Sequence, residues 1–443
     1  MKKGLLALLA LACLLLTGCQ YISLPVGEER AAPYLSVAGQ VAEAMAGGDF
    51  EAARTSFDQN LLDSVTAQTL EDIWLQLQLQ YGPYEGTVSS TATWQGGMRT
   101  YSLLGFARGN VYLQLVFEDE GVVGGIWFGP DPSSQGQELA APDDVEETAG
   151  VLKVEEGVEL PYALTRPKGL QPGEKTPVVV LVHGSGSSDK NESIGAVSPF
   201  ADIAWGLARR GVSCLRYDKR TFVYGAEYTQ QQIQDMTVEE EVIRDALAFI
   251  QEAGSLEEAS CVVLVEHSLG GMLAPRIADE SGDLAGLACL AGSPRQLWEI
   301  SLDQNLQALG NPQTLPAELE AELEKAKDIQ GLDAEDTLFG MGAAYVQDLD
   351  LHPAQASLDR LNLPIAIFQG GEDFQVGEKD YAAWEQALQS YAGRSEFHYY
   401  PELNHLLVAG TTKEEGLYGY LKPAAVDETL LDDLAAFVLS CEP

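Results

Sequence analysis

From about residue 150 onward, continuous apolar runs alternate with stretches in which apolar residues recur at helical spacing. The run Val178–Val182 is apolar throughout and rich in β-branched residues, which is typical of a strand buried on both faces of a sheet. The same pattern recurs at Val212–Tyr217, Cys261–Val265, Leu284–Leu290 and Ile365–Gln369. Strands that alternate with helices predict an α/β fold with a doubly wound, mostly parallel sheet over residues 150–443.

Residues 33–130 show a different order, with helical periodicity first and short alternating runs afterwards. Helices are expected over residues 34–47 and 49–81. Strands separated by glycine-containing turn signals are expected at Thr87–Trp94, Arg99–Ala107, Val111–Glu118 and Val122–Phe128. This order predicts a small α+β domain, which resembles the cone-shaped domains of the nuclear-transport-factor-2-like or cystatin-like type. Its sequence shows no acid/base or metal-ligand pattern, so a binding or spacing role is expected.

Two segments interrupt these patterns. Residues 131–149 are rich in Pro, Ser, Gln, Asp and Glu, which predicts a solvated linker between the two domains. Residues 295 to about 355 break the alternation of strands and helices and contain an acidic helix around Ala317–Ala326. Because α/β sheets bind ligands beyond the carboxyl ends of their strands, this long insertion predicts a helical cap over the site. The alternative is a surface insertion without a lid role.

The N-terminus has the pattern of an export signal. A basic start precedes the apolar run Gly4–Leu16, which is shorter than the roughly 20 residues that a membrane-spanning helix needs. The small residues before Cys19 resemble a bacterial lipobox. The resemblance implies a lipoprotein signal peptide over residues 1–18, a lipid on Cys19 and a tether over residues 19–32. We therefore expect export and lipid anchoring at the extracytoplasmic face of a bacterial cell membrane, with a plain secretory signal as the alternative.

The formal net charge of −41 narrows the choice of partners. Phosphate binding needs clustered Lys and Arg, so a nucleic-acid partner is excluded. An acidic surface is first of all a solubility feature, and it disfavours docking on anionic lipid headgroups. Membrane attachment is therefore expected to depend on the lipid of Cys19.

The segment Val265–Met272 carries the strongest chemical signal. Ser268 stands between a buried strand and the start of a helix, which is the context of a nucleophile elbow. The turn is expected to strain the serine backbone and to lift Oγ above the sheet, while Gly270 and Gly271 let the helix pack close to the strand. The N–H of Leu269 is expected to face a developing oxyanion at the helix N-terminus.

The elbow departs from the usual G-x-S-x-G pattern, because Glu266 stands where the first glycine is expected. This position is crowded, and the Glu266 side chain is expected to lie sideways or upward. There it could weaken catalysis, bring a carboxylate close to the site or be tolerated. His267, between Glu266 and Ser268, is expected to point elsewhere than into the site.

A second loop follows the strand at Val178–Val182. His183, Gly184, Ser185 and Gly186 place a histidine and small residues directly after this strand, as in an oxyanion loop. The N–H of Ser185 is the second expected oxyanion donor. The side chain of His183 is expected to fix the loop rather than to transfer protons.

An acid and a histidine complete the set of motifs. Asp373 follows the strand at Ile365–Gln369, where a carboxylate can orient a catalytic histidine and stabilise the imidazolium. It fits this role better than Glu372, because it lies deeper in the turn before apolar residues. His405 follows the last strand-like run, Glu396–Tyr400.

In this order, Ser268, Asp373 and His405 match the Ser…Asp…His order of α/β-hydrolases. Residues 150–440 resemble that superfamily, near the dienelactone-hydrolase-like and prolyl-oligopeptidase-like serine esterases, and the stretch Leu215–Arg220 is similar to that group as well. The resemblance implies hydrolysis of a small-molecule carboxylic ester through an acyl-enzyme, without metal or cofactor. The alternatives are a peptidase or amidase of the same fold, or a catalytically weak binding protein.

Overall fold

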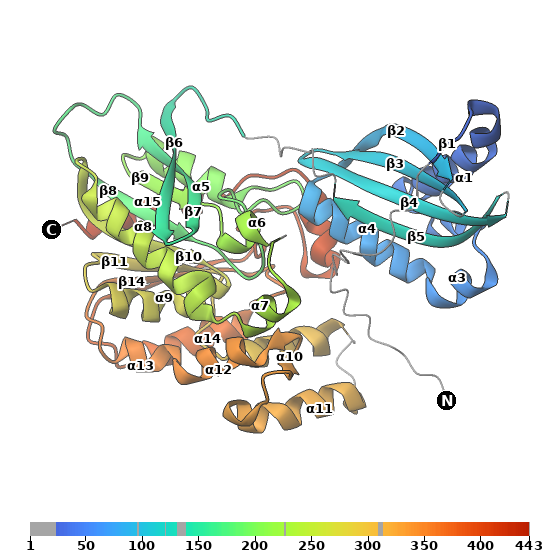
Figure 1. Cartoon of the computed structure of the whole chain (residues 1–443). Coiled ribbons are helices and arrows are strands. Elements are labelled where there is room, and N and C mark those ends of the chain that lie inside the picture. Colours follow the sequence, from blue (N-terminus) through green and yellow to red (C-terminus); the bar gives the residue numbers. More distant parts are fainter. Residues whose placement is uncertain are drawn as a thin grey trace.

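The computed structural model describes residues 24–94, 97–119, 121–130, 139–225, 227–308 and 313–442. The expected signal peptide and Cys19 lie outside these residues. Within the described ranges, no helix combines the length and the apolar character that crossing a bilayer requires. Two sheets organise the chain, and each packs against its own helices around a separate buried core (Figure 1).

The N-terminal unit is an antiparallel sheet of five strands, in the order β1-β2-β3-β4-β5, with helices packed on one face. Its strands are β1 (Leu24–Pro25), β2 (Tyr84–Trp94), β3 (Met98–Phe106), β4 (Gly109–Asp119) and β5 (Val122–Pro130). Its helices are α1 (Glu28–Ala46), α2 (Phe50–Ala53), α3 (Gln59–Ser64) and α4 (Ala67–Tyr81). Alternate residues of β3 and β4 are buried, because successive side chains of a strand face opposite sides of the sheet.

The helices of this unit differ from the prediction in two respects. The helix expected over residues 49–81 is three helices, because Asp49, Asp58 and Thr66 each begin a new one with a side-chain oxygen that accepts from a main-chain N–H. The tether expected over residues 19–32 ends earlier, since β1 already pairs with β2 and α1 starts at Glu28.

The larger sheet has eight strands in the order β15-β14-β11-β10-β8-β9-β7-β6. Its strands are β6 (Val145–Glu155), β7 (Val158–Pro167), β8 (Thr176–Val182), β9 (Ser213–Tyr217), β10 (Ala259–His267), β11 (Gly286–Leu290), β14 (Ile365–Gly370) and β15 (Ser395–Tyr400). Neighbours from β15 to β9 run parallel, whereas β7 is antiparallel to both β9 and β6. The predicted mostly parallel sheet is therefore confirmed.

Helices cover both faces of this sheet, as a doubly wound fold requires. On one face lie α5 (Pro199–Arg209) and α15 (Glu428–Ser440). On the other lie α8 (Arg244–Ser255), α9 (Leu269–Ser281) and α14 (Glu378–Ala387). The remaining described helices outside the segment between β11 and β14 are α6 (Arg220–Tyr224), α7 (Gln230–Asp235), the π-helix η1 (Glu239–Ile243) and the 3-10 helix η3 (Lys413–Leu421).

The hairpin of β6 and β7 corrects the expected start of the larger domain. Strand β6 begins at Val145, inside the linker expected over residues 131–149. Its first residues include Glu146 and Glu147, and Glu146, Thr148 and Ala149 are exposed, which is why the stretch has the composition of a solvated linker. Glu147 is nevertheless part of the fold, because its Oε2 accepts from Arg216 Nη1 at 2.8 Å and from Thr165 Oγ1 at 2.7 Å.

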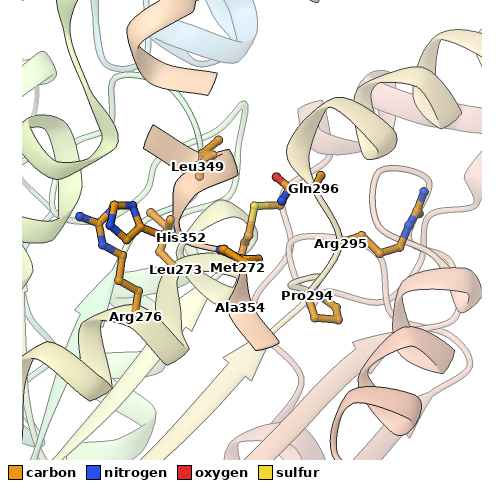
Figure 2. Close-up of a pocket in the computed structure, with 10 residues that line it drawn as sticks. Met272, Leu273, Arg276, Pro294, Arg295, Gln296, Leu349, His352 and Ala354 are labelled. Atoms are coloured by element: carbon orange, nitrogen blue, oxygen red, sulfur yellow. The ribbon is translucent and has the colours of Figure 1, made fainter. Parts of the chain in front are cut away.

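A largely helical segment fills the interval between β11 and β14, where the cap was expected over residues 295–355. Its elements are α10 (Leu297–Ala308), α11 (Ala317–Lys325), η2 (Ala326–Gly331), β12 (Thr337–Leu338), β13 (Met341–Gly342), α12 (Ala343–Leu351) and α13 (Ala354–Leu358). Arg276 of α9 anchors it through Asp348, with Nη1 and Oδ1 3.0 Å apart. Figure 2 shows Arg276 beside His352 in the narrow crevice between α9 and this segment, with Met272 and Leu349 among the lining residues.

Candidate active site

Ser268 occupies the turn between β10 and α9, and its backbone is strained. Its φ of 55° and ψ of −115° lie where L-residues are rarely found. Its N–H donates to Leu290 O on β11 at 2.9 Å, which holds the turn against the sheet. A Cβ on Gly270 would lie 2.7 Å from Val182 O, and one on Gly271 would lie 2.8 Å from Gly292 Cα, so glycine is required for this close packing.

The structure brings Ser268, His405 and Asp373 into one hydrogen-bonded chain. His405 Nδ1 lies 2.8 Å from Asp373 Oδ2, and His405 Nε2 lies 3.0 Å from Ser268 Oγ. An ionised carboxylate can only accept, so Nδ1 carries the proton and Nε2 is left to accept from the serine hydroxyl. His405 and Asp373 are 3% and 1% exposed, which shields this chain from competing water.

The carboxylate of Asp373 is fixed by its own loop. Its Oδ1 accepts from the main-chain N–H groups of Gln375 at 2.8 Å and Val376 at 2.9 Å, and its Oδ2 accepts from Gln369 Nε2 at 3.2 Å. The neighbouring Glu372 turns elsewhere and accepts from Lys413 N at 3.0 Å. The loop thus presents Asp373, and not Glu372, to the histidine.

The expected oxyanion donors border the same cavity as the serine. Ser185 and Leu269 both line it with Ser268. The first N–H groups of a helix have no intrahelical acceptor, which leaves that of Leu269 free for an oxyanion. Gly184 approaches the nucleophile so closely that a Cβ there would lie 3.0 Å from Ser268 Cβ. Gly186 has a φ of 86°, in the left-handed region that glycine adopts without strain.

His183 fixes the oxyanion loop. Its Nε2 donates to Asp189 O at 2.9 Å, across the loop that follows β8. Burial lowers the pKa of His183 to about 4, so the ring stays neutral at ordinary pH. The side chain therefore closes the loop without exchanging protons.

His267 lies behind His405, where it makes contacts that the sequence did not indicate. Its Nε2 lies 2.8 Å from His405 O, and its Nδ1 lies 2.9 Å from Glu192 Oε2, in an ion-pair contact without hydrogen-bond alignment. Burial lowers the pKa of His267, but the charge and contact of Glu192, the hydrogen bond to His405 O and the charge of Asp373 together outweigh burial and raise it. This buried pair links the oxyanion loop to the histidine loop. Glu192 lies in a polar stretch with no recognisable motif, so its part could not be predicted.

Glu266 does not lie upward near the site, which corrects that part of the expectation. It is fully buried on β10, in register with Val182 of β8 and Cys289 of β11. Neither of its carboxyl oxygens has a hydrogen-bond partner among the described residues. Burial raises the pKa of Glu266 well above its usual range, so the group is held as a neutral acid.

Replacing Glu266 with glutamine is expected to change how stability depends on pH. In the unfolded chain the carboxyl ionises above its ordinary pKa of 4.5, whereas its raised pKa keeps it protonated in the fold. The folded state then holds one more proton, so wild type loses about 1.4 kcal/mol of unfolding free energy per pH unit until the folded pKa is reached. Denaturant unfolding between about pH 4 and pH 8 should show the gap between Glu266→Gln and wild type widening as pH rises. Glu257→Gln, at an exposed carboxyl before β10, is the control. If the unfolding free energies of Glu266→Gln and wild type change with pH in parallel, the expectation is contradicted.

The cavity beside Ser268 measures about 230 Å³, and residues of the segment between β11 and β14 form part of its lining. Its apolar lining comprises Leu269, Met272, Leu297, Ile300, Phe339, Met341 and Val376. Phe339 stands at the turn between β12 and β13 with a φ of 49°, another strained position at this site. Ser293, Ser301, Gln304 and Gln375 add polar groups to the wall. The cavity thus combines an apolar lining with the Ser268 hydroxyl at its wall.

The chain is similar to a protein family, to a named esterase and to solved structures. Residues 179–415 match the sequence pattern of the Alpha/beta hydrolase family. Over 396 residues the chain is 33% identical to Esterase EstD from Thermotoga maritima, covering 88% of this chain and 92% of that protein. Among solved structures, Est1E from Butyrivibrio proteoclasticus has a TM-score of 0.43 at 18% identity, covering 66% of this chain and 98% of that chain. Dipeptidyl peptidase 4 from Porphyromonas gingivalis has a TM-score of 0.42 at 12% identity, covering 79% of this chain and 43% of that chain.

Proposed function

The chain belongs to the Alpha/beta hydrolase family, and on this premise we propose that it is a serine esterase that forms an acyl-enzyme on Ser268. The observation that carries the proposal is the position of His405, between Ser268 Oγ at 3.0 Å and Asp373 Oδ2 at 2.8 Å. The similarity to Esterase EstD over most of both chains supports the ester as the substrate class.

Acylation begins with proton transfer from Ser268 Oγ to His405 Nε2, as Oγ attacks the ester carbonyl carbon. The negative charge on the carbonyl oxygen is stabilised by the N–H groups of Leu269 and Ser185. Asp373 holds the imidazole in the required tautomer and stabilises the imidazolium. His405 then gives its proton to the leaving alcohol, and the ester C–O bond breaks.

Deacylation repeats these steps with water as the nucleophile. His405 takes a proton from water, the resulting hydroxide attacks the acyl carbon, and the proton returns to Ser268 Oγ as the acid departs. His183 takes no part, because its ring is neutral and closes the oxyanion loop. His267 stays behind His405, where it contacts the main-chain oxygen of that residue.

The size of the cavity favours short acyl groups. Its volume of about 230 Å³ is below the roughly 300–1,000 Å³ typical of sites for drug-sized ligands. Phe339 and Met341, from the β12–β13 hairpin, belong to its lining. We infer that the segment over residues 295–355 acts as the cap that limits acyl length. Export and a lipid on Cys19 remain proposals from the sequence, and they would place the esterase at the outer face of a cell membrane.

A panel of chromogenic substrates tests this function. We expect turnover of p-nitrophenyl acetate and butyrate, with kcat/KM for octanoate about tenfold or more lower, because surplus methylenes do not fit the cavity. Butyrate turnover should begin with a burst of p-nitrophenol equal to the enzyme concentration, provided deacylation is the slower step. Cleavage of aminoacyl-nitroanilides without ester turnover would instead indicate a peptidase. Absence of both activities would indicate a binding protein.

A further inference from the structure

Gly184, in the loop after β8, has both of its main-chain polar groups held by buried charged side chains. Its N–H donates to Glu192 Oε1 at 2.7 Å, and its carbonyl oxygen accepts from Lys219 Nζ at 3.1 Å. Glu192 and Lys219 are each only 2% exposed. Burying a charge is costly unless it is paired, and both of these charges are paired, Lys219 with Glu241 and Glu192 with His267. The N–H belongs to the His183–Gly184 peptide and the carbonyl to the Gly184–Ser185 peptide, so two successive peptide units are held.

Lys219 is itself held in place by an ion pair. It follows β9 and precedes α6, and its Nζ lies 3.1 Å from Glu241 Oε1. The other oxygen of Glu241 accepts from Tyr345 Oη of α12 at 2.9 Å. Glu241 belongs to the π-helix η1, an element that is rare and frequently found at functional sites. The ammonium group therefore has a fixed position, connected to the segment that forms part of the cavity lining.

The peptide unit that joins Gly184 to Ser185 makes the orientation of the Ser185 N–H depend on the contact between Lys219 and the Gly184 carbonyl. A trans peptide is planar, so its C=O and N–H point to opposite sides. Holding the Gly184 oxygen toward Lys219 therefore directs the Ser185 N–H away from Lys219. Ser185 lines the cavity with Ser268, and its N–H makes no hydrogen bond within the described ranges.

We propose that Lys219 is a positioning residue of the oxyanion hole, which keeps the Gly184 carbonyl turned away from the cavity and the Ser185 N–H turned toward it. This inference rests on the proposed function. Without the ammonium group, rotation of the peptide would bring a carbonyl oxygen toward the developing oxyanion, where the two would repel. The contact also polarises the peptide, which strengthens the hydrogen bond that its N–H donates.

The test uses two variants of the full chain. Lys219→Met keeps most of the side-chain length but removes the donor. The double variant Lys219→Met/Glu241→Gln also removes the negative charge of Glu241, which Lys219→Met alone leaves unpaired. In both, kcat for p-nitrophenyl butyrate is expected to fall by about 10- to 100-fold, less than the 10²–10³ typical of deleting an oxyanion donor, with little change in KM. The inhibition constant of an alkylboronic acid, whose adduct with Ser268 is tetrahedral, is expected to rise by a similar factor. The inhibition constant of butyrate, whose carboxylate is planar, is expected to be the same in the variants as in wild type.

The control is Lys190→Met, which removes a charge near the same loop and is expected to keep the wild-type kcat. The Lys190 ammonium group lies 3.9 Å from Asp218. A double variant with wild-type kcat would show that Lys219 only neutralises Glu241, and a boronic-acid constant that does not follow kcat would assign Lys219 to folding. Either result overturns the inference on Lys219. The proposed function is tested separately, by ester turnover of the wild-type protein. If wild type itself forms no acyl-enzyme, both fall.

Discussion

Replacing Ser268 with alanine is expected to lower kcat for ester hydrolysis by about 10⁴- to 10⁶-fold. Without Oγ there is no nucleophile for the acyl-enzyme, and the residual rate comes from water attacking beside the oxyanion donors. Members of such a unit act together, so the loss should nearly equal that of removing the whole set. The measurement is steady-state turnover of p-nitrophenyl butyrate, together with mass spectrometry of the protein after a fluorophosphonate probe.

Ser301→Ala is the matched control, because this serine lines the same cavity. Its hydroxyl donates to Leu297 O at 3.0 Å within α10, whereas the His405 ring bonds Asp373 and Ser268. We expect Ser301→Ala to have a kcat of the same order of magnitude as wild type and to be labelled by the fluorophosphonate probe. Substantial turnover by Ser268→Ala, or a probe adduct on another serine, would show that the nucleophile has been misassigned.

Ser268 and Asp373 could be predicted because each follows a buried strand that the hydrophobic pattern identifies, and His405 because it follows a strand-like run late in the chain. Ser268 follows β10, Asp373 follows β14, and His405 comes after β15. In a parallel sheet, the carboxyl ends of the strands meet at one edge, so strand recognition alone brings distant residues together. Chain order then limits the choice of acid and histidine.

The groups that support the site could not be predicted in the same way. Glu192, Lys219 and Glu241 lie in polar stretches. Their partners are the main chain of Gly184, each other, and side chains from distant parts of the chain such as His267 and Tyr345. These pairings depend on the paths of loops, which hydrophobic periodicity does not encode. Glu266 was visible as a departure from the elbow pattern, but the sequence does not show whether such a side chain is buried or exposed. The structure has it buried and neutral.

The start of the larger sheet escaped prediction for a related reason. Strand β6 pairs only with β7, at the edge of the sheet, so many of its positions face solvent and need not be apolar. Its composition is then the same as that of a linker. Central strands are buried on both faces and give continuous apolar runs, which explains why the predicted boundary fell at residue 150 and not at Val145.

Asp373→Asn is expected to lower kcat by about 10⁴-fold while leaving the fold intact. The N–H groups of Gln375 and Val376 both donate to Oδ1, so the asparagine oxygen must occupy that position. The amide NH₂ then takes the place of Oδ2, 2.8 Å from His405 Nδ1, and donates to it. In this orientation the asparagine NH₂ also faces Gln369 Nε2, which donates to Oδ2 in the wild type, so one hydrogen bond is lost. The opposite orientation would lose the two hydrogen bonds to Oδ1 and is therefore less favourable.

An amide that donates to Nδ1 moves the proton of His405 to Nε2, the nitrogen that faces Ser268. A protonated Nε2 cannot accept the serine proton, so the variant holds the correct geometry in the wrong tautomer. Glu372→Gln removes the same charge one position earlier, on a side chain that bonds Lys413 N, and is expected to keep most of the activity. Equal losses in the two variants would mean that negative charge in this loop matters and tautomer control does not. A much larger loss in Asp373→Asn, with labelling of Ser268 by the fluorophosphonate slowed in proportion and an unchanged melting temperature, is the result that the hydrogen-bond pattern requires.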